Sequence, residues 1–120
     1  MNDTLVSVII PTYNRAKTVR NAIDSVLQQT YKNIEIIVID DGSSDNTAQV
    51  LESYRNKVQI IQQENAGPSV ARNRGIEIAN GDIFCFLDSD DLWLPTKIER
   101  QVNFRGDFST GIFLFIRSNN

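Results

Sequence analysis

Four short apolar runs alternate with stretches of helical periodicity, and this alternation restricts the possible folds more than any other feature of the chain. The runs lie at Leu5–Ile10, Ile34–Ile39, Val58–Ile61 and Ile83–Leu87, and the first is rich in β-branched residues, as strands are. Strands that alternate with helices form parallel sheets with right-handed crossovers, so the predicted fold class is α/β. We expect a doubly wound, mainly parallel sheet with helices on both faces.

A helix is expected after each of these strands, over about 16–29, 45–54, 68–79 and 95–104. In the first, apolar residues recur at the spacing of one helix face, at Val19, Ala22, Ile23, Val26 and Leu27. Ser44 or Asp45 is expected to cap the second helix, and Pro68 to open the third. Because proline cannot donate to a strand ladder, the first strand is expected to end at Pro11.

Charge and composition exclude several classes of function. The 120 residues carry a formal net charge of −3, with no histidine and one cysteine. Without a basic block, nucleic acid is not an expected partner, and without histidine there is neither a histidine-based triad nor a zinc–histidine site. Cys85 lies inside an apolar run and is expected to be a packed core thiol in a reducing compartment. No signal peptide or transmembrane segment is expected, since no apolar run approaches the roughly 18 residues of a membrane-spanning helix.

Three carboxylates follow the fourth strand within four positions, at Asp88, Asp90 and Asp91. Carboxylates this close repel one another unless a positive charge lies among them, and such hard oxygen ligands suit Mg²⁺ or Mn²⁺. If the strand continued through them, Asp88 and Asp90 would point to the same face. The alternative is a polar loop that caps the next helix, where aspartate is common. The residues of this stretch alone leave both interpretations open.

Polar residues also follow the first two strands, with Thr12 and Tyr13 after the first and Asp40 and Asp41 after the second. The carboxyl ends of parallel strands lie along one rim, so three segments are expected to converge on one acidic crevice. A dinucleotide-binding domain would need a Gly-x-Gly-x-x-Gly turn after the first strand, and neither that turn nor a Walker-type phosphate loop is present. A phosphoacceptor signalling domain would need its acidic pair after the first strand rather than the second.

Four motifs, in order along the chain, resemble those of family 2 glycosyltransferases. They lie at 6–14 (VSVIIPTYN), 40–45 (DDGSSD), 65–73 (NAGPSVARN) and 88–91 (DSDD). The resemblance runs from about Leu5 to Val102 and implies a GT-A fold with a Rossmann-like nucleotide-binding half. It also implies inverting, metal-dependent transfer of a sugar from a nucleotide-diphosphate sugar. A UDP-sugar is the expected donor, and a carbohydrate or lipid-linked molecule is the expected acceptor.

The resemblance implies nucleotide-sugar contacts for a set of residues that match the motifs, namely Pro11, Thr12, Tyr13, Asp41, Arg72 and Asp88. Tyr13 would stack on a uracil-like base, or else be a partly buried aromatic residue of the turn. Asp41 matches the carboxylate that accepts from the ring N–H of the base, whereas Asp40 would satisfy nearby backbone donors. The sequence does not separate these two. Arg72 would contact phosphate or base carbonyls, or else be a solvated helix charge.

The stretch Asp88-Ser89-Asp90 matches the Asp-x-Asp signature of the family. By this resemblance Asp88 would contact the donor ribose, directly or through water, and Asp90 would ligate Mn²⁺ or Mg²⁺. The metal would bridge two phosphates and neutralise charge on the departing nucleoside diphosphate. Asp91 is expected to cap the following turn, and Trp93 to be a packing anchor.

The resemblance ends near Phe104. Residues 1–104 are predicted to be the nucleotide-sugar-binding half of a glycosyltransferase domain, and residues 105–120 a divergent or truncated tail with an edge strand at Ile112–Ile116. The family's general base, a carboxylate of the acceptor half, has no match, and Asp107 is not expected to replace it. The expected function is glycosyl transfer; the alternative is a catalytically inactive module that binds nucleotide-sugar and metal. The expected location is cytoplasmic, with peripheral attachment at the inner membrane face as an option.

Overall fold

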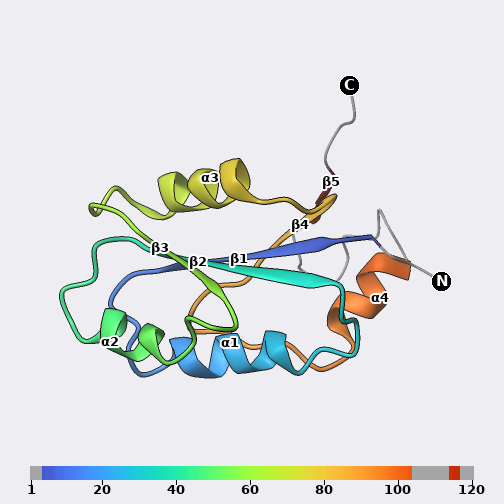
Figure 1. Cartoon of the computed structure of the whole chain (residues 1–120), viewed down its shortest axis with the longest axis horizontal. Coiled ribbons are helices and arrows are strands. Elements are labelled where there is room, and N and C mark those ends of the chain that lie inside the picture. The colour runs from blue at the N-terminus through green and yellow to red at the C-terminus, as the bar shows by residue number, and fades with distance from the viewer. Residues whose placement is uncertain (1–3, 104–113, 117–120) are drawn as a thin grey trace.

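The chain forms a single mixed sheet, seen in a computed structural model that describes residues 4–103 and 114–116. The strand order is β3-β2-β1-β4-β5 (Figure 1). Neighbouring strands pair in parallel, except that the last strand pairs antiparallel with β4. The strands are β1 (Val6–Thr12), β2 (Ile34–Asp40), β3 (Gln59–Gln62), β4 (Ile83–Phe86) and β5 (Leu114–Ile116). The predicted α/β class and mainly parallel sheet are confirmed. The rest of the predicted tail, including Asp107, lies outside the described residues.

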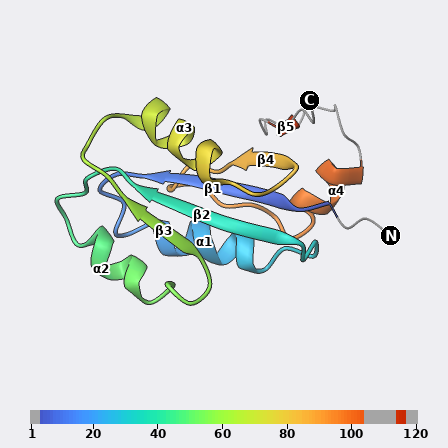
Figure 2. The ribbon, with the colours of Figure 1, turned by 45° about the horizontal axis from the view of Figure 1, so that its top comes forward.

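Helices cover both faces of the sheet, as predicted. They are α1 (Val19–Leu27), α2 (Thr47–Glu52), α3 (Pro68–Ile78) and α4 (Lys97–Asn103). Helix α3 lies on one face, and α1 and α2 lie on the other (Figures 1 and 2). Alternate residues of β1 divide between the two cores: Val8 and Ile10 pack on the side of α1, and Ile9 packs on the side of α3. Successive side chains of a strand point to opposite faces, so β1 contributes residues to the apolar core on each side of the sheet.

The expected end of the first strand at Pro11 is wrong, because β1 continues to Thr12 and Pro11 pairs with Ile39 of β2. The carbonyl of Ile9 accepts from Leu87, and that of Thr12 accepts from Asp41. The backbone N–H and C=O groups of successive β1 residues thus point alternately towards β4 and β2. By this alternation, the backbone nitrogen of Pro11 points towards β4. Strand β4 no longer pairs with β1 beyond Ile9, so the missing N–H of proline costs no ladder bond.

Helix α1 is shorter than expected at both ends. Its predicted start at Ala16 is replaced by a turn in which the N–H groups of Thr18 and Val19 donate to the carbonyl of Arg15. Its predicted last residue, Gln29, is fully buried beyond the helix. The Gln29 amide donates to the carbonyl of Leu94 (2.8 Å) and accepts from the N–H of Ile98 (3.0 Å). A buried, fully bonded glutamine thus joins the end of α1 to the start of α4.

Strand β4 ends at Phe86, one residue before the predicted end, so the argument that strand pleating aligns Asp88 and Asp90 does not apply. The two side chains are exposed and Ser89 between them is buried, because a turn follows in which the N–H of Asp91 donates to the carbonyl of Asp88. Trp93 packs against the larger core, as predicted. No helix within the described ranges is long and apolar enough to cross a membrane.

Candidate functional site

A cavity of about 510 Å³ opens where β1, β2 and β4 end. Its lining includes every residue for which the sequence predicted a binding role: Pro11, Thr12, Tyr13, Asp41, Arg72, Asp88 and Asp90. Segments separated by up to about eighty positions therefore meet at one rim, as expected for the carboxyl ends of parallel strands. The structure brings these side chains together, while their individual roles stay predictions.

The same cavity has lining residues that the sequence did not single out as site residues: Arg15, Asn65, Gly67, Pro68, Ala71 and Ser89. All of them except Arg15 lie inside the four sequence motifs, but a motif does not show which of its side chains face a cavity. Arg15 directly follows the Tyr13-Asn14 turn and adds a second cation to a wall that was predicted to contain only Arg72.

Two loops that follow β1 and β2 are bonded to each other, and this places Tyr13 at the rim. The backbone N–H groups of Ser44 (2.8 Å) and Asp45 (3.3 Å) donate to the Asn14 side-chain carbonyl. The Asn14 N–H in turn donates to the hydroxyl of Ser43 (2.9 Å). Asn14 has a positive φ of 52°, a conformation that asparagine tolerates better than most residues. Tyr13, a residue that is 45% exposed, thus lines the cavity from a fixed turn.

The two neighbouring carboxylates after β2 have different partners, which the sequence could not distinguish. Asp40 accepts from the backbone N–H (3.2 Å) and the hydroxyl (2.6 Å) of Ser43, as expected of a residue that satisfies the local turn. Asp41, 3% exposed, instead lines the cavity and accepts from the loop between β3 and α3. The structure therefore separates a turn-stabilising carboxylate from a cavity-lining one.

Four donors surround the carboxylate of Asp41. Oδ1 accepts from the Gln63 amide (2.9 Å) and the Ala66 N–H (2.8 Å), and Oδ2 accepts from the Asn65 amide (3.2 Å) and the Gly67 N–H (3.0 Å). Burial alone would raise the pKa of Asp41, but the hydrogen bonds from Gln63, Ala66 and Gly67 lower it below its usual value. Asp41 is therefore an anion held in place by the loop that leads into α3.

Helix α3 begins directly after these donors, so Asp41 also fixes the start of the helix. Gly67, the residue before the helix, has a φ of 100°, which L side chains rarely adopt. Arg72 lies on the second turn of α3, and its Nη2 approaches Oδ1 of Asp88 at 3.9 Å. Both groups are well exposed, so this ion pair contributes little to stability. Its significance is that a guanidinium and the Asp88 carboxylate flank the same cavity.

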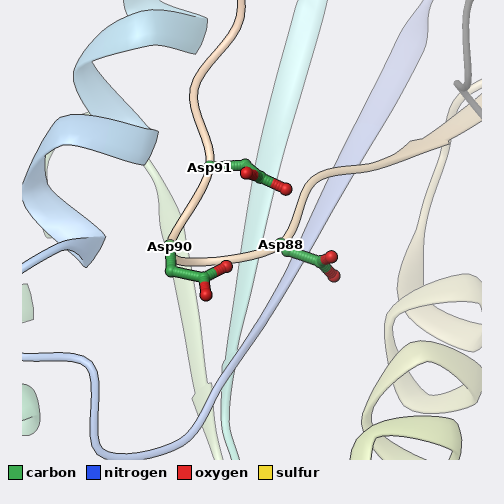
Figure 3. A group of neighbouring side chains, drawn as sticks. All are labelled: Asp88, Asp90 and Asp91. Atoms are coloured by element: carbon green, nitrogen blue, oxygen red, sulfur yellow. The ribbon is translucent and has the colours of Figure 1, made fainter.

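The carboxylates of Asp88, Asp90 and Asp91 form one exposed acidic group on the turn that follows β4 (Figure 3). Each offers an oxygen, and these oxygens lie within 4.8 Å of one another. Three carboxylate oxygens at this spacing match the hard ligand set that Mg²⁺ and Mn²⁺ prefer. Asp91, expected only to cap a turn, therefore joins the two carboxylates of the predicted Asp-x-Asp signature in space.

At the carboxyl ends of the strands, the site thus combines the aromatic residue Tyr13, the hydrogen-bonded carboxylate of Asp41 and the guanidinium groups of Arg15 and Arg72. The acidic group on the turn after β4 lies at the same end. Residues 7–118 match the sequence profile of a family described as Glycosyl transferase family 2. The chain belongs to this family. The solved structures that it resembles are glycosyltransferases of the GT-A fold, and the α/β sheet of this chain has that fold.

Three proteins illustrate what this family 2 chain is similar to. A UDP-Glc:alpha-D-GlcNAc-diphosphoundecaprenol beta-1,3-glucosyltransferase of Escherichia coli, WfgD, is 46% identical over 105 residues. Staphylococcus aureus TarS, in a structure of residues 1–349 in complex with UDP-GlcNAc, is 35% identical with a TM-score of 0.77. The mannosyltransferase PcManGT of Pyrobaculum calidifontis, solved with GDP-Man and Mn²⁺, is 26% identical with a TM-score of 0.76.

The similarity covers most of this chain and a minor part of each relative. It covers 86% of this chain and 42% of WfgD, 83% and 30% for the TarS structure, and 87% and 33% for PcManGT. A glycosyltransferase of Rickettsia typhi that is 52% identical is covered to 31% of its length. The chain thus spans less than half of the length of these relatives.

Proposed function

We propose that the chain carries the donor-binding part of a glycosyltransferase that transfers a sugar from a nucleotide-diphosphate sugar to a carbohydrate-type acceptor. The observation that carries the proposal is the single cavity that joins the ends of β1, β2 and β4 and is lined by all seven predicted binding residues. The named relatives that bind UDP-GlcNAc or GDP-Man support the class of donor. A UDP-sugar is the proposed donor.

The proposed roles follow from the chemistry of the lining. Tyr13 offers an exposed ring on which a base can stack, and Asp41 offers an anionic acceptor for a ring N–H. Arg72 suits phosphate oxygens or base carbonyls, because a guanidinium donates in a planar fork. Asp88, which lines the same cavity, would accept from a ribose hydroxyl. Pro11 and Thr12 line the same cavity and would contact the nucleoside.

A divalent cation, Mn²⁺ or Mg²⁺, fits the acidic group at the mouth of this cavity. Asp90 would hold it, with Asp88 and Asp91 close enough to contribute further oxygens. When bound, such an ion supplies Lewis-acid stabilisation of the diphosphate leaving group. The Mn²⁺ in the PcManGT structure supports this choice of ion. The chain's own contribution is to keep three carboxylates together on a short turn beside Arg72.

The acceptor and the stereochemical course belong to the same proposal. An inverting displacement needs a general base near the acceptor hydroxyl, and we expect that base from a segment other than residues 4–103. The WfgD name supports a lipid-diphosphate-linked sugar as acceptor, which would place the reaction at a membrane face. The second candidate is a binding module that holds nucleotide-sugar without turnover. It rests on the lining of the described cavity, to which donor and metal contacts but no general base are assigned.

Calorimetric titration of UDP into the protein, with and without Mn²⁺, tests the proposal. We expect binding that depends on the metal and is lost in Asp90→Ala, because removal of the carboxylate leaves too few hard ligands. Asp82→Ala, another exposed aspartate that does not line the cavity, is the matched control and should bind as the parent does. Equal UDP affinity in the parent protein and in Asp90→Ala would refute the metal site.

A second assay separates the two candidates. The chain and a longer protein that contains the corresponding acceptor half are incubated with UDP-sugar and a carbohydrate acceptor. Transfer by the longer protein that is lost in its Asp90→Ala variant would support the enzyme, and donor binding without transfer in both would support the binding module. Absence of any nucleoside diphosphate binding would contradict both candidates.

A further inference from the structure

The carboxylate of Asp41 is already fully bonded in this structure. A carboxylate has about four lone-pair sites, and four donors from the loop between β3 and α3 occupy them. The ring N–H of a nucleobase that bonds to Asp41 would therefore be a fifth donor, and it must displace one of the four. This inference rests on the proposed function, because it asks how the proposed base acceptor becomes available.

The four donors are not equally easy to displace. The N–H groups of Ala66 and Gly67 belong to the backbone just before α3, so moving them would shift the start of the helix. The Gln63 amide approaches from the end of the edge strand, and Gln63 is not among the residues that line the cavity. A ligand in the cavity would therefore contact Asn65 rather than Gln63.

The Asn65 amide differs from the other three donors in three respects. It makes the longest of the four bonds to the carboxylate (3.2 Å), and Asn65 lines the cavity. Its Nδ2 also donates to the backbone carbonyl of Asp41 at 3.0 Å, so it keeps an acceptor when it leaves the carboxylate. Asn65 is also an exposed residue, so displacement of its amide from the carboxylate does not incur the cost of an unpaired buried donor.

We infer that Asn65 is an exchangeable donor: its amide bonds to Oδ2 of Asp41 in this structure and yields that oxygen to the ring N–H of a nucleobase. Asn65 is then a positioning and specificity-determining residue. The exchange favours bases that present a ring N–H, such as uracil or guanine. It disfavours cytosine, whose corresponding ring nitrogen is an acceptor and cannot replace the lost donor.

The direct test observes the side-chain amides by ¹⁵N–¹H NMR during titration with UDP and, separately, with CDP, both in the presence of Mn²⁺. The Asn65 signals are assigned by their loss in Asn65→Ala. We expect the Asn65 amide protons to shift upfield at saturating UDP, because the bond to the anionic oxygen is lost. They should stay in place with CDP, and the Gln63 amide should stay in place with both.

The affinity ratio between UDP and CDP provides a second readout. In Asn65→Ala the ring N–H displaces only water from Oδ2, so the ratio should rise by about twofold to fivefold, which is the effect of a modest hydrogen bond. In Asp41→Asn the ratio should fall towards one, because the amide presents donors to the base as well as an acceptor. A merely structural role of Asn65 would weaken both nucleotides alike and leave the ratio unchanged.

The outcomes are distinguishable from failure of the proposed function. If neither nucleotide binds, the donor-site proposal itself fails. If UDP binds but the Asn65 amide does not move, or the Gln63 amide moves instead, the exchange is refuted while the donor site stands. An unchanged or lowered ratio in Asn65→Ala, with the fold preserved by circular dichroism, would also refute it.

Discussion

Asp41 holds two walls of the cavity together through its carboxylate. It links the end of β2 to the loop before α3 through two backbone and two side-chain donors. Sequence reasoning identified Asp41 as a binding residue from its motif, but it assigned no partner within the protein. The donors lie more than twenty positions away along the chain, and no local sequence pattern predicts that they bond to Asp41.

Replacement of Asp41 by asparagine tests this role through pH. At pH 7 we expect Asp41→Asn to lower the free energy of unfolding by about 1–3 kcal/mol, because an amide presents its own donors to the N–H groups it must bond. The folded-state pKa of Asp41 is lowered, so its stabilisation is present above the unfolded pKa of about 3.9 and disappears as pH falls through the folded pKa.

The difference between the parent protein and Asp41→Asn should therefore shrink as pH falls below about 4, the ordinary pKa of an aspartate. Urea denaturation at pH 7, 5 and 3.5 measures it, with the exposed Asp82→Asn as the control. A difference that is the same at all three pH values would show that the charge of Asp41 is not what the loop requires.

Asn14 combines a backbone requirement with a bonding requirement, and substitution can separate them. Asn14→Ala loses both the tolerance for a φ of 52° and the acceptor for Ser44 and Asp45, so we expect a loss of about 1–3 kcal/mol in unfolding free energy. Asn14→Gly keeps the backbone conformation and should lose less. Chemical denaturation of both variants measures the order, and equal losses would show that only the hydrogen bonds matter.

At the scale of elements, helix α3 carries Arg72 to the cavity, and its distance from the sheet is set by a glycine. A Cβ at Gly75 would lie 2.5 Å from Cγ2 of Ile9, a fully buried residue of β1. The helical pattern of the sequence does not reveal this constraint; the packed structure shows that a methyl group at Gly75 would collide with Ile9. The small side chains of Ala71 and Gly75 allow the helix axis to approach β1 closely.

Gly75→Ala therefore sets two effects against each other. The gain in helix propensity is at most about 1 kcal/mol, whereas overpacking a rigid core costs about 1–3 kcal/mol, so we expect net destabilisation. The exposed Asn73→Ala on the same helix has only the propensity term and should be neutral or slightly stabilising.

A double-mutant cycle with Ile9→Ala identifies the contact. If Ile9 is the side chain that resists the new methyl group, Gly75→Ala should cost less in the Ile9→Ala background than in the parent protein. Thermal or urea unfolding of the four proteins measures the coupling. Strict additivity would mean that another neighbour of Gly75 bears the strain.

At the scale of the whole molecule, the single cysteine reports on cooperative unfolding. Cys85 is fully buried in β4, and burial raises the pKa of its thiol to about 12. A thiol reagent at pH 8 should not modify the native protein and should react at once in concentrated urea, because the thiolate is the reactive form. Rapid native-state labelling would instead indicate local opening of β4.

An exposed thiol supplies the matched control for this measurement. Asn73→Cys in a Cys85→Ala background places a thiol on the exposed side of α3, and it should react without denaturant. The ratio of the two labelling rates then gives the free energy of the opening that exposes Cys85, as long as opening and closing are fast relative to modification.

Periodicity along the chain was sufficient to predict the order of the elements, the two-faced sheet and the rim at which Thr12, Asp41 and Asp90 meet. Those features depend on the spacing of apolar residues and on the geometry of parallel strands, which neighbouring residues encode. The family resemblance then supplied the residues expected to line the site.

Tertiary structure alone decided the features that depend on distant partners. Pro11 stays within β1 because β4 has already ended beside it, and Asp91 joins Asp88 and Asp90 because of the turn after Phe86. Asp41 is held by donors from the loop before α3. A hydrogen bond between segments far apart in sequence produces no periodic pattern in the sequence. It forms only because the packed elements bring its donor and acceptor together.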